Sequence, residues 1–266
     1  MPEQTTGPVS ERFYPDRVIG ARVITYAEVD STMNVASVRA EAGSPHGTVI
    51  RAHAQRTGRG RFARRWESAI GDSLLTSTIL RMPPLAIGAS VAIAATLAVR
   101  DTVLHLTGPE CAIKWPNDVH VHGRKIAGVL VEASLDTAGN GFAIVGIGLN
   151  VNLNPSNFPA ITEAATSLAL EAGHSISMDL AEATLLAKLD TAINQIAGDP
   201  QATLAAWRAA LDTLGRQVTV QTRNGPLAGI AEDVNEEGSL LLRTPDAILH
   251  TLAEGDVSLG TNFGVW

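Results

Sequence analysis

The sequence predicts an α+β protein made of one large domain and one small domain. The chain has 266 residues, which exceeds what a single small core needs. Helical and strand-like patterns follow one another irregularly up to residue 212, whereas five short strands with turn signals between them fill roughly the last fifty residues. We therefore expect an N-terminal arm at 1–20, a large mixed domain at 21–212 and a small β-barrel at 213–266.

Composition limits the possible functions. Hydrophobic residues make up 45% of the chain and charged residues 18%, as in a soluble globular protein. The formal net charge of −7 argues against a dedicated nucleic-acid binder. Cys111 is the single cysteine, so an internal disulfide is excluded and a reducing compartment is expected. No signal peptide is apparent, and the apolar run 85–106 contains polar residues that favour a buried helix over a membrane span. We expect a cytoplasmic protein.

The first part of the chain has clear strand and helix signals. Residues 22–28 and 47–54 have the composition of strands. Between them, Ser31 and Thr32 stand where a helix cap belongs, and Gly43 with Pro45 follows the helix.

The middle of the chain predicts further strands and one long helix. An Ala-rich helix is expected at 86–106, and the predicted strands are 73–80, 110–115, 142–152 and a hairpin of 119–122 with 125–132 turning at His122-Gly123. Gly146 and Gly148 interrupt the strand at 142–152, a position where a ligand or another chain segment usually lies close. His120 and His122 lack a third partner of metal-binding type, which favours a solvated hairpin over a metal pair. Trp115 is open to two interpretations, core packing or ligand contact.

Two helices precede the predicted barrel. Asp179 with Glu182 three residues later resembles a capping box for a helix at 180–197. Asp199-Pro200 predicts the start of the next helix, since proline suits the first helical position. The predicted barrel strands are 217–222, 227–234, 239–243, 247–253 and 256–259.

Residues 55–66 form an arginine loop in an otherwise acidic protein. Its five arginines are Arg56, Arg59, Arg61, Arg64 and Arg65. Gly58 and Gly60 allow the backbone to approach a ligand closely. Because the guanidinium group is always charged and suits phosphate or carboxylate, the loop predicts a flap over an anion. A solvated basic surface loop is the alternative.

Four segments together resemble the biotin–protein ligase family, also called biotin–[acetyl-CoA-carboxylase] ligases. They are Ser31-Thr32, the Gly-Arg-Gly-Arg loop with Gln55 and Trp66, Lys-Trp-Pro-Asn-Asp at 114–118, and Lys125-Ile-Ala-Gly128 with Gly146-Ile-Gly-Leu-Asn150. Order and spacing match over about 25–260. The resemblance implies a mixed-sheet catalytic domain of the class II aminoacyl-tRNA synthetase type with an SH3-like C-terminal barrel. It also implies formation of biotinyl-5′-AMP from biotin and ATP, followed by transfer of biotin to a lysine of a carrier domain.

The same resemblance implies roles for individual residues. The catalytic residues would be Lys125, Arg59, Arg61 and Asp118, with Asp118 also the candidate Mg²⁺ ligand and the candidate general base. The biotin-binding residues would be Ser31, Thr32, Gln55, Arg59, Gly60, Arg61, Lys125, Gly128 and Gly146. The nucleotide-binding residues would be Arg61, Arg64, Trp66, Lys114, Asn117, Lys125 and Asn150.

Three positions depart from the pattern of the family. Ala63 stands at the third glycine of the loop, where it tolerates positive φ poorly. Met33 replaces an asparagine found in many members, and Gly260 replaces an arginine found in some. These departures leave the path of the loop and two side-chain contacts open.

The expected partners follow from this interpretation. They are biotin, ATP with Mg²⁺ and a biotin carboxyl carrier protein or domain, with no tightly bound cofactor, no DNA and no membrane. The protein could be a monomer or a homodimer. A lipoate or octanoyl ligase or transferase of the same superfamily is one alternative, and a biotin-sensing regulator is another. Twenty residues before the core cannot form a helix-turn-helix module, so we expect no operator binding. An RNA-binding protein is disfavoured by the acidic balance.

Overall fold

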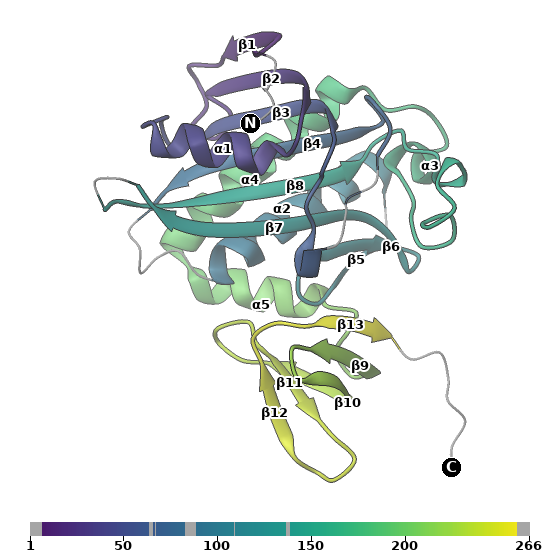
Figure 1. Cartoon of the computed structure of the whole chain (residues 1–266). Coiled ribbons are helices and arrows are strands. Elements are labelled where there is room, and N and C mark those ends of the chain that lie inside the picture. Colours follow the sequence, from purple (N-terminus) through teal and green to yellow (C-terminus); the bar gives the residue numbers. More distant parts are fainter. Residues whose placement is uncertain are drawn as a thin grey trace.

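The computed structural model places the chain in a large unit of helices and strands and a small β unit below it (Figure 1). It describes residues 7–63, 66, 68–82, 89–108, 110–136 and 139–259, without the side chains of Ala63 and Leu259. The arginine at position 64 and the glycine at position 260, both named above, lie outside the described residues.

The large unit is built on one mixed eight-stranded sheet. Its strands are β1 (Ser10–Phe13), β2 (Arg22–Val29), β3 (Thr48–Gln55), β4 (Ser73–Arg81), β5 (Cys111–Lys114), β6 (Asp118–Val121), β7 (Arg124–Leu135) and β8 (Gly141–Asn150). Their order is β1-β2-β3-β4-β8-β7-β6-β5, and only β2 and β3 pair in parallel. Each predicted strand is present, and the arm contributes the short edge strand β1.

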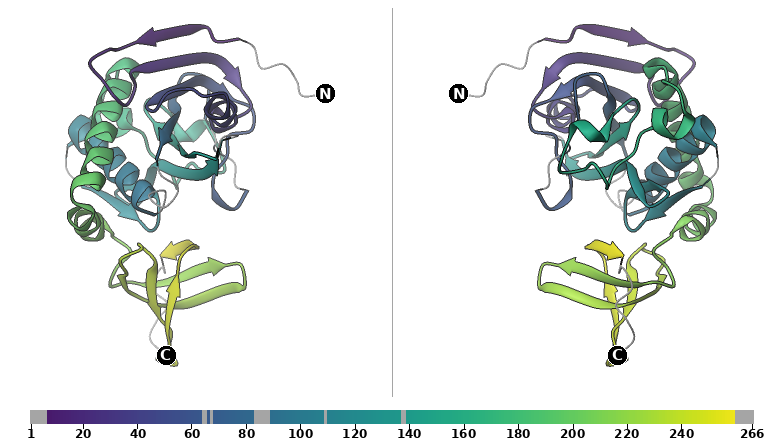
Figure 2. Two further views of the ribbon diagram at one scale, coloured as in Figure 1. Left: turned by 90° about the vertical axis from the view of Figure 1, so that its left-hand side faces the viewer. Right: turned by 90° about the vertical axis from the view of Figure 1, so that its right-hand side faces the viewer.

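The described part of the chain contains five α-helices: α1 (Thr32–Glu41), α2 (Ala89–Thr107), α3 (Leu168–Ala172), α4 (Met178–Gly198) and α5 (Pro200–Ala210). Helix α1 lies on one face of the large sheet, and α2 and α4 cover the other (Figure 2). Short 3₁₀ turns occur at Arg61–Ala63 and Pro155–Asn157. The face that carries α1 is only partly covered by a helix, which leaves room for a site beside it.

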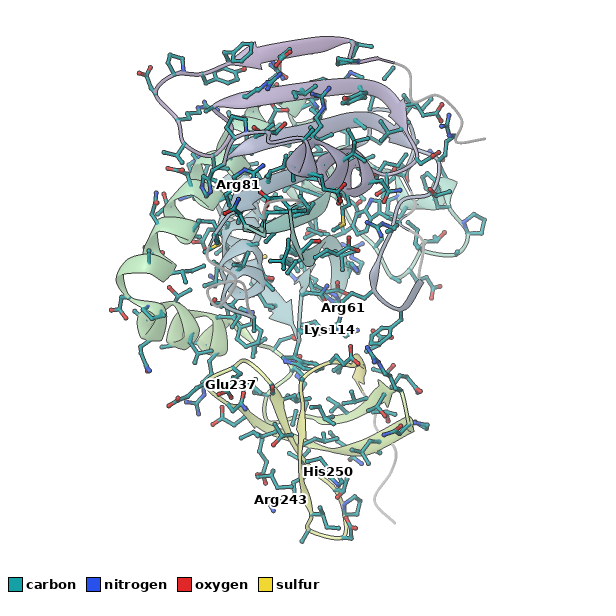
Figure 3. The ribbon with its side chains drawn as sticks, turned by 60° about the vertical axis from the view of Figure 1, so that its left-hand side comes forward. Arg61, Arg81, Lys114, Glu237, Arg243 and His250 are labelled. Atoms are coloured by element: carbon teal, nitrogen blue, oxygen red, sulfur yellow. The ribbon has the colours of Figure 1, made fainter. Side chains whose placement is uncertain are left out.

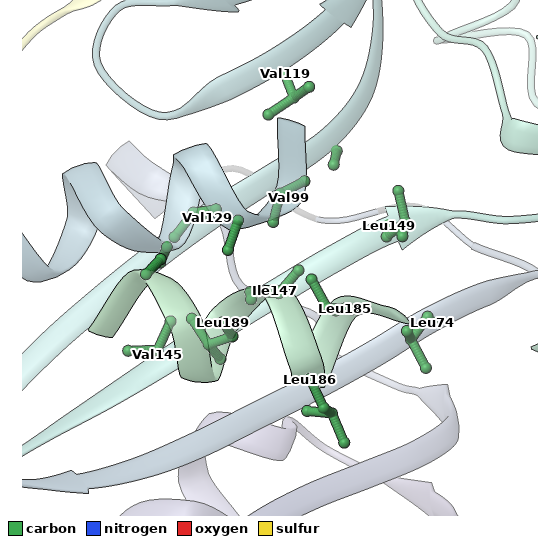
Figure 4. Close-up of a cluster of buried hydrophobic side chains, with 14 of the residues drawn as sticks. Leu74, Val99, Val119, Val129, Val145, Ile147, Leu149, Leu185, Leu186 and Leu189 are labelled. Carbon is green, nitrogen blue, oxygen red and sulfur yellow. The ribbon is translucent and has the colours of Figure 1, made fainter. Parts of the chain in front are cut away.

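The main core fills the space between the sheet and the two long helices. Leu74, Val145, Ile147 and Leu149 from β4 and β8 meet Leu185, Leu186 and Leu189 of α4 and Val99 of α2 (Figure 4). These side chains are between 0% and 3% exposed, so burial of aliphatic surface is the main stabilising contribution, as expected for a chain with few aromatic residues.

Helix α2 is the apolar helix that the sequence predicts. Among the described residues it alone has the length and mean hydropathy of a membrane span, a test that the core helix of a soluble protein also passes. Most of its buried apolar side chains join the main core against β7 and α4, and Ile93 joins a second apolar cluster with Trp115.

The helix caps match the sequence in two cases out of three. The Ser31 hydroxyl accepts from the Met33 amide at 3.3 Å, and Asp199 accepts from the Ala202 amide at 2.9 Å. The predicted cap at Asp179 is wrong, because Ser177 caps α4 and accepts from the Leu180 amide. Asp179 lies in the first turn, where its negative charge complements the helix dipole.

The small unit is a five-stranded antiparallel sheet. Its strands are β9 (Gln217–Thr222), β10 (Gly225–Val234), β11 (Leu240–Arg243), β12 (Leu249–Leu252) and β13 (Asp256–Leu259), in the order β12-β11-β10-β9-β13. All five predicted strands are present. The α+β fold class with a small C-terminal β domain is confirmed.

Trp115 joins the two units. Its side chain is 1% exposed and packs with Trp207, Val218 and Leu240 in one apolar cluster. Its indole N–H donates to the Gly238 carbonyl at 3.0 Å. Of the two interpretations offered for Trp115, the structure supports core packing.

Candidate active site

The partly open face of the large sheet holds two adjoining cavities. The first cavity is lined by residues that include Ser31, Thr32, Met33, Gln55, Arg59, Gly60, Arg61, Asn117, Gly128, Leu130 and Gly146. The second cavity is lined by Lys114, His120, Asn150, Ile161, Ala164, Ala165, Val257 and Ser258. Trp66, Asp118, Lys125 and Asp256 line both. The structure thus gathers every described site residue named from the sequence around two spaces that share four lining residues.

The inner end of the first cavity is a closed hydrogen-bond network. Both the backbone amide and the hydroxyl of Thr32 donate to Gln55 Oε1, at 2.7 and 3.1 Å. The Ser77 hydroxyl donates to Thr32 Oγ1 at 2.8 Å. Ser31 and Thr32 are 1% and 3% exposed, so these polar groups are held in fixed positions.

Lys125 lies where the two cavities meet. Its Nζ is 2.7 Å from Asp118 Oδ1 and 5.5 Å from the centre of the Trp66 ring. The backbone of Lys125 is held on both sides, because its amide donates to Ala164 O and its carbonyl accepts from the Thr166 amide. An ammonium group fixed in this way can neutralise two anions brought together beside it.

The arginine loop closes over the first cavity with partners from both units. Arg59 Nη2 lies 2.9 Å from Glu132 Oε2 on β7. Arg61 donates to Asn117 Oδ1 at 3.4 Å and to the Gly255 carbonyl at 3.1 Å. Figure 3 shows Arg61 and Lys114 at the end of the large unit that faces the small domain. Burial lowers the pKa of the Arg61 guanidinium, against the opposing effect of Asp118 and two nearby carboxylates.

Three glycines form the floor of the first cavity. A Cβ at Gly148 would lie 2.6 Å from Cε2 of the Trp66 ring, and one at Gly128 would lie 3.2 Å from the same ring. A Cβ at Gly146 would lie 2.7 Å from the sulfur of Met33. From the sequence, the glycines in the strand at 142–152 indicate the close approach of a ligand or another segment. In the structure, Trp66 approaches Gly148 and Met33 approaches Gly146.

The second cavity has a polar wall. The Asn150 side chain is 3% exposed, donates to Thr166 O at 2.9 Å and accepts from Ser73 Oγ at 3.3 Å. His120 is 8% exposed, and its Nδ1 lies 3.2 Å from the Gly123 carbonyl. Burial lowers the pKa of His120. The prediction of a solvated hairpin is therefore wrong for His120, while His122 is more than half exposed.

In the arginine loop, the positive φ occurs at a different residue from the one that the sequence suggested. Ala63, at the usual third glycine, is not among the residues with positive φ. The neighbouring Phe62 has φ 54° and ψ 40° instead. The left-handed backbone of the loop therefore falls on Phe62, whose bulky side chain disfavours it, and not on Ala63.

Some lining residues carried no usable sequence signal. Asp256 reaches the site from β13 of the small domain, about 130 residues beyond Lys125 in the chain, and no local pattern links the two. Leu130, which lines the first cavity, lies on β7 among other residues of ordinary strand composition, as does Glu132, the partner of Arg59. Charge alone predicts that the loop arginines pair with acidic side chains. It does not predict which acidic residue each arginine contacts.

Comparison with known proteins bears on this arrangement. The Biotin/lipoate A/B protein ligase family matches residues 26–152, and the Biotin protein ligase C terminal domain matches residues 213–260. The biotin–[acetyl-CoA-carboxylase] ligase of Mycobacterium tuberculosis is 32% identical over 248 residues, which cover 88% of this chain and 90% of that protein. This chain belongs to the biotin protein ligase family.

Two further members of the family align over most of the chain. The bifunctional ligase/repressor BirA of Bacillus subtilis is 31% identical over 91% of this chain and 75% of its own length. The biotin protein ligase of Aquifex aeolicus, solved in complex with biotin and ATP, superposes with a TM-score of 0.75 at 26% identity, over 90% of this chain and 99% of that one. The resemblance drawn from the four sequence segments is confirmed.

Proposed function

We propose that this biotin protein ligase joins biotin to a protein lysine at the expense of ATP, through biotinyl-5′-AMP. The observation that carries the proposal is the position of Lys125, which lines both cavities and is held beside Asp118 at 2.7 Å. The first cavity ends in fixed polar groups that suit a ureido ring, and the second is lined by Lys114 and Asn150, whose charge and amide suit a nucleotide. A cation at the meeting point of two cavities suits two anionic substrates that must react there.

In the first half-reaction, a carboxylate oxygen of biotin attacks the α-phosphorus of ATP. The bond from that phosphorus to the oxygen bridging to the β-phosphate breaks, and pyrophosphate leaves. Lys125, Arg59 and Arg61 reduce the repulsion between the two anions. Ser31, Thr32 and Gln55 hold the ring end of biotin, while Gly60, Gly128 and Gly146 leave space for it.

The nucleotide is held by residues of the junction and the second cavity. Trp66 offers an indole face, Lys114 a positive charge, and Asn117 and Asn150 amide groups. We include Arg64 on the basis of its place in the loop sequence.

In the second half-reaction, the lysine amine of a biotin carboxyl carrier domain attacks the acyl carbon. The bond from that carbon to the AMP oxygen breaks, AMP leaves, and the amine loses a proton. Asp118 faces both cavities and is the carboxylate we assign to accept that proton.

Mg²⁺ fits the residues present. Among the described residues no cluster of three or more His, Cys, Asp or Glu side chains forms a metal cage. Mg²⁺ commonly uses one or two carboxylates together with phosphate and water, and Asp118 would supply the carboxylate. When bound, the ion would offset charge on the leaving pyrophosphate.

The remaining assignments extend this proposal. We place the enzyme in the cytoplasm as a monomer or homodimer that binds neither DNA nor membranes. We divide the chain into an arm at 1–20, a catalytic domain at 21–212 and a C-terminal domain at 213–266.

The test is direct. Purified protein is incubated with ATP, Mg²⁺ and either biotin or lipoic acid, and pyrophosphate release is measured with and without a carrier domain. We expect release and carrier labelling with biotin only. Absence of biotinyl-AMP would overturn the proposal, and a preference for lipoic acid would replace biotin with the second acid.

A further inference from the structure

Glu171 is a nearly buried carboxylate that the proposed reaction does not use. It lies on the short helix α3, and its side chain is 10% exposed. Its Oε1 accepts hydrogen bonds from Arg124 Nη2, at 2.9 Å, and from the Thr166 hydroxyl. Its Oε2 lies 3.9 Å from His122 Nε2. One carboxylate therefore joins α3 to the start of β7 and to the segment that precedes α3.

Thr166 connects this carboxylate to two residues of the site. Thr166 is 0% exposed, and its amide donates to the Lys125 carbonyl at 2.9 Å. Its own carbonyl accepts from Asn150 Nδ2 at 2.9 Å. The Lys125 amide donates to Ala164 O at 2.8 Å, so the segment 164–166 holds Lys125 from both sides. Lys125 and Asn150 share this support, and the bond from the Thr166 hydroxyl fastens it to Glu171.

The sheet itself holds Lys125 weakly. On the β6 side the register shifts, because Val119 faces Ala127 whereas His120 faces Lys125. Such a bulge redirects side chains and interrupts the ladder of hydrogen bonds. On the other side, the pairing of β7 with β8 reaches only as far as Ala127 with Leu149. Beyond that point an isolated bridge to Ala165 continues the sheet at Lys125. The direction of Lys125 therefore depends on the segment that Glu171 anchors.

We propose that Glu171 is a positioning residue that acts through Thr166 and Arg124 to fix Lys125 in the geometry that activates the acid. This inference rests on the proposed function and deepens it. Glu171 lines neither cavity, so it acts without touching a substrate. Because catalysis by a placed charge depends steeply on its position, a small displacement of Lys125 is enough to slow adenylate formation.

Three variants separate the parts of this support. Glu171→Ala removes the acceptor, Glu171→Gln keeps an acceptor oxygen of the same reach, and Thr166→Val removes only the hydroxyl. Asp136→Ala is the matched control. The Asp136 side chain is 12% exposed and lies 3.2 Å from Arg81, but it follows the opposite end of β7 and lines neither cavity.

The first measurement is the single-turnover rate of biotinyl-AMP formation at saturating ATP, together with the KM for biotin and thermal unfolding. We expect Glu171→Ala and Thr166→Val to lower the rate about tenfold while the KM for biotin stays within about twofold. Glu171→Gln should stay within about threefold of the parent, because its oxygen can still accept both hydrogen bonds. Asp136→Ala should lower the melting temperature without lowering the rate.

The second measurement separates positioning from a general structural role. Glu171→Ala is combined with Lys125→Ala, and the residual rate is followed over long incubations. If Glu171 acts through Lys125, its removal should change the rate of Lys125→Ala less than about twofold. An equal loss in both backgrounds overturns the inference, as does a parent-like rate in Glu171→Ala. If Glu171→Ala does not fold, the same cycle is measured with Thr166→Val.

The two proposals fail in different ways. If the parent protein makes no biotinyl-AMP, the proposed function is wrong. If the parent makes it and the losses in Glu171→Ala and Lys125→Ala are independent, only the role of Glu171 is wrong.

Discussion

The two ends of the first cavity are held by different kinds of interaction. At the inner end, Thr32 is 3% exposed and bonded to Gln55 and Ser77 by short neutral hydrogen bonds. At the outer end, the side chains of Arg59 and Glu132 are 39% and 44% exposed, and one ion pair joins them. The inner end is fixed by secondary structure, and the outer end by contacts that solvent weakens.

This difference indicates which end of the first cavity recognises the ligand and which end closes over it. A buried network that is already satisfied recognises a ligand without reorganising, because its groups are placed by α1 and the end of β3. An exposed ion pair contributes only about 0–1 kcal/mol, so an incoming phosphate or carboxylate can replace Glu132 at little cost. Recognition is thus expected at the inner end and closure at the outer end.

The largest expected effect is at Lys125, where the first and second cavities meet. Lys125→Ala removes the cation that faces both anions, and adenylate formation should fall about 10²–10³-fold. Its side chain is 35% exposed, so the melting temperature should change little. Pyrophosphate release and thermal unfolding are measured together, with Lys188→Ala on α4 as control. Loss of folding in Lys125→Ala would show a structural role instead.

Arg59→Ala tests the outer end. Without this arginine the loop should release biotinyl-AMP early and label lysines on unrelated proteins, with a dissociation rate raised about 10–10²-fold. Streptavidin blotting of bovine serum albumin added to the reaction detects such labelling. Retention of the intermediate at the parent rate would contradict a closing role for the outer end.

Thr32→Val tests the inner end. The substitution keeps the shape but leaves the Ser77 hydroxyl without its acceptor, which should lower the free energy of unfolding by about 1–3 kcal/mol. The KM for biotin should rise about tenfold, the equivalent of one lost hydrogen bond of this kind. Thr96→Val removes a hydroxyl that bonds within α2, to Ala92 O, and should destabilise the protein without changing the KM. An unchanged KM in Thr32→Val would remove the distinction between the two ends.

Glu132→Gln is expected to have a small effect in the opposite direction. It frees Arg59 from its partner in this structure, so affinity for biotinyl-AMP should increase by up to about fivefold. Isothermal titration with a non-hydrolysable analogue at two salt concentrations measures the change, which should shrink at high salt. Weaker binding would mean that Glu132 positions Arg59 for the ligand.

The rate of Cys111 alkylation should not depend on either end of the first cavity. Burial raises the pKa of the Cys111 thiol to about 12, so almost no thiolate is present at pH 8 and alkylation by iodoacetamide should be slow. Denaturant should make it fast. Protection that changes on addition of biotin or ATP would show that ligand binding reaches the edge strand β5.

Much of the architecture was predictable because it depends on local chemistry. Ser31 caps α1 as its hydroxyl and position suggest, and Asp199 with proline starts α5. The Asp179 cap was wrong because Ser177, two residues earlier, competes for the same helix start. Ser177 and Asp179 are local signals of equal strength for the start of α4. Only packing decides between them, because it sets where α4 meets the sheet.

The sequence by itself determined the main strands, four of the five described α-helices and the polar and cationic residues that line the two cavities, because alternation, caps and short motifs act over a few residues; α3 (Leu168–Ala172) was not predicted. Only the tertiary structure decided that Asp256 from the small domain joins Lys125, that Trp66 lies on Gly128 and Gly148, and that Phe62 carries the left-handed backbone. These contacts join segments far apart in the chain, and their energies depend on how whole sheets and loops pack together.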